Sequence, residues 1–278
     1  MRRSAVLGRS EKLLAVLVQQ AERIGERLGA ALIGTDLYIE GMDRDWFRST
    51  AWTEADRAEF ERRLARARRY NRPQYLRIKG IALHGVGEVD SARALWHRVL
   101  DDVETSWVDA APTAEHLADS YRTDAQELAA FYYREVERLS PTGSATSGTH
   151  QIRLAQLLLD TGSDHDLEEV ELLLNRWIES TSGRLPSQLF LWNVTFIHWA
   201  LRLGADEPAR DAARRAVDLA ARGPVFTRHP TVGVVVADET TLDWLHSLAE
   251  PDERPETGRP ALWRRMLSRG FGADRSSR

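Results

Sequence analysis

Residues 75–100 read YLRIKGIALHGVGEVDSARALWHRVL and contain two helical segments with a glycine-rich turn between them. Gly80 falls in the first segment, Gly87 at the turn, and Ala92 and Trp96 in the second segment. From Pro73 onward the chain keeps alternating between helical segments of roughly 12–15 residues and short turns, which is typical of an array of α-helical hairpins. We therefore predict an all-α fold.

The hairpin recurs three times after residue 100. Equivalent positions in the second helices are Ala92, Ala129, Val170 and Ala209, at steps of 37, 41 and 39 residues. The other residues that define the three later copies are Ala118, Tyr121, Tyr133 and Pro141, then Ala155, Leu158, Gly162, Leu174 and Trp177, then Leu203, Gly204, Ala213, Ala216 and Val217.

This pattern resembles the tetratricopeptide repeat (TPR), in which small residues let two helices cross closely and larger residues fill the gaps between them. The resemblance covers residues 73–222 and implies antiparallel helical hairpins stacked as a TPR-like α-solenoid, with capping helices at the N- and C-terminal ends. Because the steps exceed the roughly 34 residues of the family, a generic array of helical hairpins is the alternative.

The chain divides into four predicted regions. They are an N-terminal helical cap (1–72), the array of about four hairpins (73–222), a C-terminal cap (223–250) and a flexible tail with a short amphipathic helix (251–278). Within the array, residues 142–149 are rich in Ser, Thr and Gly, which indicates a flexible connection.

Local signals add detail to the two caps. An apolar stripe predicts a helix over residues 10–32. A second helix should begin at Thr53, with Asp56 as the acid of a capping box, and residues 71–73 should end it, because the residue before a proline leaves the helical region. The β-branched run 232–237 indicates one short strand or a buried extended segment.

Composition excludes several classes of protein. With 42% apolar and 29% charged residues in 278, the chain is neither disordered nor a membrane protein, and no targeting signal is evident, so we expect a cytoplasmic location. A net charge of −4 argues against a surface that coats nucleic acid. The absence of cysteine excludes disulfides, thiol catalysis and cysteine-type metal sites.

No enzyme motif is present. The chain lacks the phosphate-binding loops of nucleotide enzymes and the zinc-protease and serine-hydrolase signatures, and no motif supports a catalytic role for any of its 8 histidines. The acidic run 164–166 is better explained as a helix start than as a metal site. We therefore predict no catalytic residue, metal or cofactor.

A basic cluster lies in the second predicted helix. Between residues 53 and 79 there are nine basic and four acidic side chains. The cluster comprises Arg62, Arg63, Arg66, Arg68 and Arg69. It fits a solvated helix face, a contact with an acidic protein, or nucleic-acid binding, although no aromatic residues are interleaved with it as in RNA-binding motifs. The opposite charge of residues 160–180 leaves self-association open as well.

Resemblance to the TPR family implies that first helices line a concave groove. The candidate groove residues are Gln74, Arg77, Ile81, His84, Asp119, Arg122, Gln156, Val194, His198 and Leu201. The lining does not reproduce the carboxylate clamp of the family, since Ile81 stands where an asparagine is needed. We therefore expect a noncatalytic scaffold that binds an unidentified protein or peptide, with a nucleic-acid-associated helical protein using the basic cluster as the alternative.

Overall fold

The computed structural model describes residues 45–102, 106–141, 145–161, 163–180 and 184–250. These residues fold into helices, as predicted, and form no β-strand. They belong to two compact units, which we call the N-terminal unit (45–150) and the C-terminal unit (151–250). The predicted helix at 10–32 and the tail at 251–278 lie outside the described residues.

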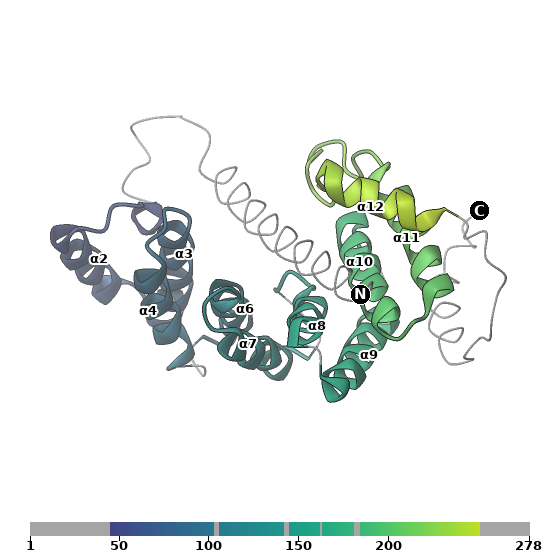
Figure 1. Ribbon diagram of the computed structural model, residues 1–278. Helices are drawn as coiled ribbons and strands as arrows, with labels where there is room; N and C mark the ends of the chain where they lie inside the picture. The colour runs from purple at the N-terminus through teal and green to yellow at the C-terminus, as the bar shows by residue number, and fades with distance from the viewer. Residues whose placement is uncertain (1–44, 103–105, 142–144, 162, 181–183, 251–278) are drawn as a thin grey trace. The chain divides into compact units, whose positions relative to one another are not determined.

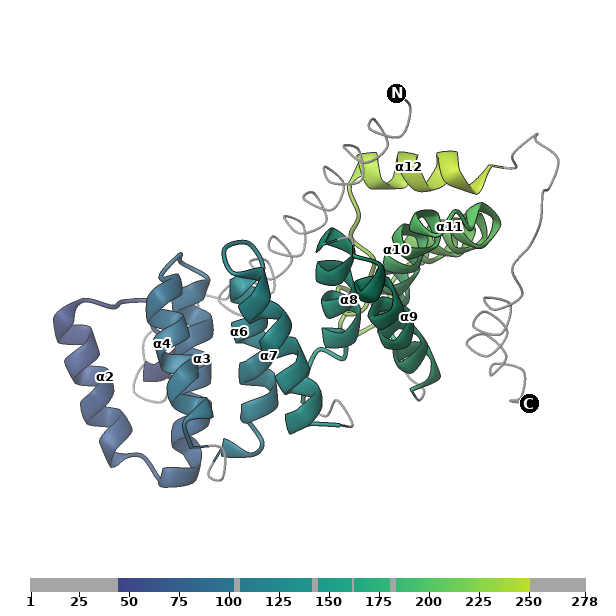
Figure 2. The ribbon, with the colours of Figure 1, turned by 60° about the horizontal axis from the view of Figure 1, so that its bottom comes forward.

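In the N-terminal unit, helices that follow each other in the chain pack in pairs. The elements are η1 (Trp46–Arg48), α2 (Glu54–Arg66), η2 (Arg69–Asn71), α3 (Arg72–His84), α4 (Val89–Leu100), α6 (Ala110–Tyr121) and α7 (Gln126–Leu139). Figures 1 and 2 show α3 beside α4 and α6 beside α7, each pair joined by a short turn. The turn between α3 and α4 contains Gly87 at φ 86°, a left-handed conformation that glycine adopts without strain.

In the C-terminal unit, α10 and α11 form a similar pair. The elements are α8 (His150–Thr161), α9 (Asp164–Glu179), α10 (Pro186–Arg202), α11 (Asp206–Ala220) and α12 (Glu239–Ala249). Buried alanines on α11, including Ala209, Ala213 and Ala216, allow α11 to approach α10 closely, and α12 packs against α11. Helical hairpins are therefore confirmed, whereas the TPR arrangement stays a prediction.

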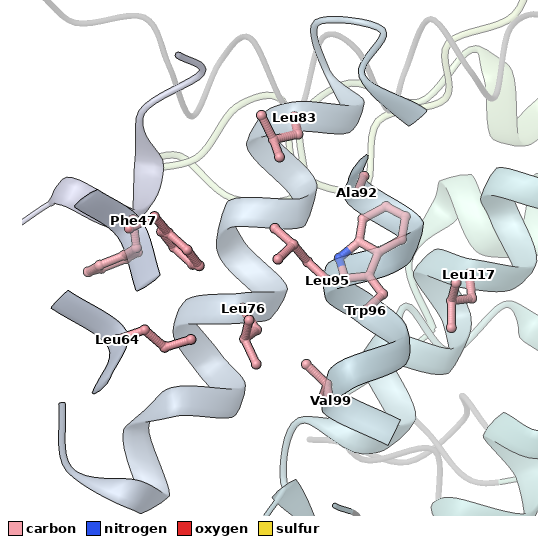
Figure 3. Packing of buried hydrophobic residues seen from close by; sticks show 10 residues of the cluster. Phe47, Leu64, Leu76, Leu83, Ala92, Leu95, Trp96, Val99 and Leu117 are labelled. Carbon is pink, nitrogen blue, oxygen red and sulfur yellow. The ribbon is translucent and has the colours of Figure 1, made fainter. Parts of the chain in front are cut away.

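One hydrophobic core cluster of the N-terminal unit lies mainly between α2, α3 and α4 and extends to Leu117 of α6. Figure 3 shows Leu76 of α3 and Val99 of α4 pointing into the space between their helices, with Trp96 on the side of α4 that lies nearer to Leu117. Only 2% of the surface of Trp96 is exposed, so this side chain lies in the core. Burying such an aromatic side chain is among the larger single contributions to stability in a domain of this size.

The start of α2 follows its local sequence, but its end does not. The Thr53 hydroxyl accepts a hydrogen bond from Asp56 N (3.3 Å), and the Asp56 carboxylate accepts one from Thr53 N (2.9 Å), which is the predicted capping box. However, the helix ends at Arg66, so the predicted end at 71–73 is wrong. Pro73 lies instead in the first turn of α3, where its missing N–H leaves no hydrogen bond unmade.

One of two irregular segments differs from its prediction. Of the connection at 142–149, the structure describes residues 145–149, where Ser147 N donates to the Glu115 carboxylate (2.8 Å), and its flexibility stays a prediction. The run at 232–237 forms neither a strand nor a buried segment: Val232 and Val236 are 42% and 51% exposed. This run is instead tied to the start of α10, where Ser187 N donates to the carbonyl oxygen of Gly233 (3.0 Å).

Candidate functional site

The predicted groove residues divide between the two units. Six of the ten lie in the N-terminal unit. Helix α3 carries Gln74, Arg77, Ile81 and His84, helix α6 carries Asp119, and Arg122 follows α6 directly. The remaining four belong to the C-terminal unit. Whether all ten line one continuous groove stays a prediction.

Arg77 connects its helix to two neighbours. Its Nε donates to the Asp109 carboxylate (2.8 Å), and this ion pair is largely buried, with 22% and 14% of the two side chains exposed. Its carbonyl oxygen accepts a hydrogen bond from Trp96 Nε1 (3.1 Å). Since Asp109 immediately precedes α6, Arg77 holds α3, α4 and α6 together and has a structural role in addition to any contact with a partner.

Three aromatic rings from these helices lie in a row beside Arg77. The Trp96 ring centroid is 5.6 Å from that of His84 and 5.5 Å from that of His116. His84 is exposed, whereas His116 Nε2 is buried and has no hydrogen-bond partner within the described residues. Burial lowers the pKa of His116 to about 4, against the opposing effect of the nearby Asp119 carboxylate. The His116 ring is therefore neutral at pH 7.

Asp119 and Arg122 meet at the hydroxyl of a tyrosine on α7. Tyr133 donates to the Asp119 carboxylate (2.5 Å) and accepts from Arg122 Nη1 (3.2 Å). Tyr133 and Arg122 are 1% and 6% exposed. These three residues therefore fix α7 against α6.

Among the six candidate groove residues of this unit, Gln74 and His84 are the exposed ones, and Ile81 on the same helix is half-buried.

The four candidate residues of the C-terminal unit lie mainly in its interior. Val194 is 1% exposed, and Gln156 is 5% exposed with its amide donating to Thr195 Oγ1 (3.2 Å). His198 is 7% exposed, and its ring stacks on that of Trp244 at 5.1 Å. Burial also lowers the pKa of His198 to about 4. Leu201 is half-buried.

Two tryptophans of α10 are also interior residues. Trp192 and Trp199 are 0% and 4% exposed. Their indole nitrogens donate to the carbonyl oxygens of Leu174 and Leu167, both at 3.0 Å. Each tryptophan therefore satisfies its polar atom within the fold.

The acidic run at 164–166 begins a helix, as predicted. Ser163 Oγ accepts a hydrogen bond from Asp166 N (3.2 Å), which caps α9. Across the residues that the structure describes, no group of three or more His, Asp or Glu side chains is arranged to hold a metal ion.

Most arginines of the basic cluster have partners within the fold. Arg62 pairs with Glu59, as does Arg63 (2.5 Å), and Arg69 lies 3.3 Å from the Asp102 carboxylate. Arg66 is exposed at the end of α2. Ion pairs between arginine and glutamate at three- and four-residue spacing are usual on a solvated helix face, which agrees with that interpretation for Arg62 and Arg63.

A pocket beside this cluster has no counterpart among the features predicted from the sequence. A cavity of about 350 Å³ lies between α2, α3 and α4 and includes Arg69 in its lining. Its other charged side chains are Glu61, Arg72, Arg98 and Asp102. Glu61 and Arg98 are 37 residues apart in the chain and meet only after folding, so no local pattern points to this pocket.

Comparison with known proteins adds no family. No family model matches the chain, and neither a curated protein nor a solved structure shows significant similarity to it. Among the described helices, none is both long and apolar enough to cross a lipid bilayer.

Proposed function

We propose that the chain is a noncatalytic scaffold that binds a peptide or helix of a partner protein. The proposal extends the resemblance to the TPR family, in which stacked helical hairpins offer a continuous surface to a ligand. In this chain the ligand would lie along α3 and α6, and the hairpins would stack as an α-solenoid.

The observation that carries this proposal is the row of rings from α3, α4 and α6. Trp96 anchors the row in the core, while His84 at its end and Gln74 on the same helix are exposed and Ile81 is half-buried. A rigid row of this kind keeps exposed side chains in position without a partner, and such preorganisation lowers the entropic cost of binding. Aromatic and amide groups also suit recognition of a peptide, since they combine apolar area with hydrogen bonding.

The test is a pull-down with the tagged full chain and its variant Gln74→Ala/His84→Ala. The matched control is Gln126→Ala/His246→Ala, which removes the same two residue types from exposed positions on α7 and α12. We expect the first variant to lose a near-stoichiometric protein partner by about tenfold or more, as for residues that dominate an interface, and the control to retain it. Equal recovery by both variants, with unchanged helical content, contradicts this surface.

A further inference from the structure

The pocket between α2, α3 and α4 has an apolar floor and a charged rim. Leu64, Leu76 and Val99 form the floor, each from a different helix. These three residues belong to the core cluster in Figure 3, so the floor is as rigid as the core itself. The volume of about 350 Å³ is at the lower end of the range for ligand-binding cavities, which suits one large apolar side chain better than a cofactor.

Arginine outnumbers carboxylate on the rim. Arg98 makes a bidentate ion pair with Glu61, with N–O distances of 2.6 and 3.0 Å. Arg72 donates to the carbonyl oxygens of Ala65 (2.8 Å) and Ala67 (3.1 Å) at the end of α2, so its guanidinium is held by backbone oxygens.

Arg69 makes the loosest contact of the three rim arginines. Its Nη2 lies 3.3 Å from the Asp102 carboxylate, and the two side chains are 75% and 49% exposed. An ion pair this exposed contributes little to stability. An incoming carboxylate can therefore bind Arg69 at small cost to the fold.

The surface beside the pocket extends the positive charge. Arg62 and Arg66 each follow a pocket residue of α2 by one position and lie on the adjacent stripe of the helix, where Arg62 is paired with Glu59 and Arg66 is exposed. In the turn after α2, Arg68 donates to the hydroxyl of Tyr70 (2.8 Å), which is 62% exposed. Exposed arginine and tyrosine are enriched where proteins bind each other.

From this combination we infer that the pocket binds an acidic segment of a partner protein, with one apolar side chain of the segment inserted between Leu64, Leu76 and Val99. Carboxylates of the segment bind Arg69 and the arginines of α2, and the apolar floor receives the anchor. This inference rests on the proposed function, because it names the chemistry of the partner, but it uses a different surface from Gln74 and His84.

The experiment measures binding of labelled peptides to the full chain by fluorescence anisotropy. The probe is the peptide DELDELDELDEL, compared with a form that has glycine for every leucine and a form that has lysine for every acid. A single-stranded oligouridine is the nucleic-acid probe. We expect only the first peptide to bind well, and its affinity to fall as salt rises from about 50 to about 200 mM, as expected for contacts between opposite charges.

Two variants of the pocket test where the peptide binds. Arg69→Glu reverses a rim charge, and Ala65→Trp fills the pocket from an exposed position of α2. Both should weaken binding by about fivefold or more, through lost charge pairing and lost space respectively. The controls are Arg138→Glu, which reverses an exposed paired arginine on α7, and Ala94→Trp, at an exposed position of α4 outside the lining; both should bind as the parent chain does.

The outcomes separate the alternatives. Equal binding of all three peptides, unchanged binding by Arg69→Glu, or preference for oligouridine overturns the inference. If the chain self-associates in a concentration-dependent way and Arg69→Glu abolishes this, the pocket binds a second copy of the chain, and the inference is overturned as well. If the pull-down partner is lost with Gln74→Ala/His84→Ala but retained with Arg69→Glu, the proposed function stands and the acidic-segment inference fails.

Discussion

The indole of Trp96 lies where a side chain on Gly80 would begin. A Cβ atom built on Gly80 would come within 2.7 Å of ring atoms Cδ1 and Cε2 of Trp96, which is closer than such atoms can approach. The ring is held in this position by the hydrogen bond from its Nε1 to the carbonyl oxygen of Arg77. Helices α3 and α4 therefore reach their observed separation because residue 80 has no side chain.

Gly80→Ala should destabilise the fold. The added methyl forces Trp96 or one of the two helices to move, and such overpacking costs about 1–3 kcal/mol. The higher helix propensity of alanine, worth at most about 1 kcal/mol, offsets only part of this cost. We expect a lower urea midpoint. Gly85→Ala is the control, because its Cβ would meet only backbone oxygens at 3.5 and 3.6 Å. A Gly80→Ala chain as stable as the control would contradict the close contact.

The Arg77–Asp109 ion pair predicts a measurable coupling between α3 and α6. Because both side chains are largely buried, removing one leaves the other poorly paired. Arg77→Gln and Asp109→Asn should each cost about 1–3 kcal/mol in the free energy of unfolding. A double-mutant cycle should give a coupling energy of about 1 kcal/mol or more.

The matched control for that cycle is Arg138–Glu135 on α7, whose arginine is 63% exposed. Exposed pairs couple by about 0–1 kcal/mol. Coupling at Arg77–Asp109 no larger than at this pair would show that the contact does not hold the helices together. Since Arg77→Gln should alter the fold, its effect on partner binding is not a clean test of the groove, and Gln74 and His84 are better positions.

His116 should make the N-terminal unit sensitive to acid. Its pKa is about 4 in the folded chain, against about 6.5 for an unperturbed histidine, so the unfolded chain binds this proton first as pH falls. The stability contributed by the neutral ring is full above pH 6.5 and is lost between about 6.5 and 4. At pH 5 the loss is about 2 kcal/mol relative to pH 7.

Urea unfolding of the parent chain and of His116→Gln at both pH values measures this effect. His116→Gln should lose about 2 kcal/mol less than the parent between pH 7 and pH 5, because glutamine does not titrate. The charged groups around the ring act in opposite directions, with Asp119 raising its pKa and Arg77 and His84 lowering it. Equal pH dependence of the two chains would show that His116 already binds its proton readily in the folded state.

The secondary structure could largely be predicted from the sequence, because its signals are local. Gly80, Ala92 and Trp96 indicated a helical hairpin, and Thr53 with Asp56 indicated a helix start. Pro73 was misinterpreted because proline both follows helices and begins them, and residues 71–73 alone do not distinguish the two.

The candidate site was less predictable, because it depends on contacts between distant residues. The resemblance to the TPR family placed Arg77 and Asp119 on first helices, but it could not show that Asp109 and Tyr133 bind them. His116 had no motif, and its low pKa results mainly from its burial in the folded chain. Burial of polar groups such as these follows from tertiary packing, which a helical period does not encode.

Trp244 should control the protonation of His198 in the C-terminal unit. The two rings are nearly parallel, with an interplanar angle of 14°, so the indole covers one face of the imidazole. His198 Nε2 is buried without a hydrogen-bond partner in the described part of the chain. Burial is the main cause of the His198 pKa of about 4, and the positive charge of Arg202 lowers it further.

Trp244→Ala opens that face of the imidazole to water, so the His198 pKa should rise toward about 6.5. Trp244→Phe retains a ring and should keep the pKa low. An NMR titration of the imidazole Cε1–H resonance, assigned with His198→Gln, measures both shifts; the same titration midpoint in Trp244→Ala as in the parent would mean that other neighbours keep water away.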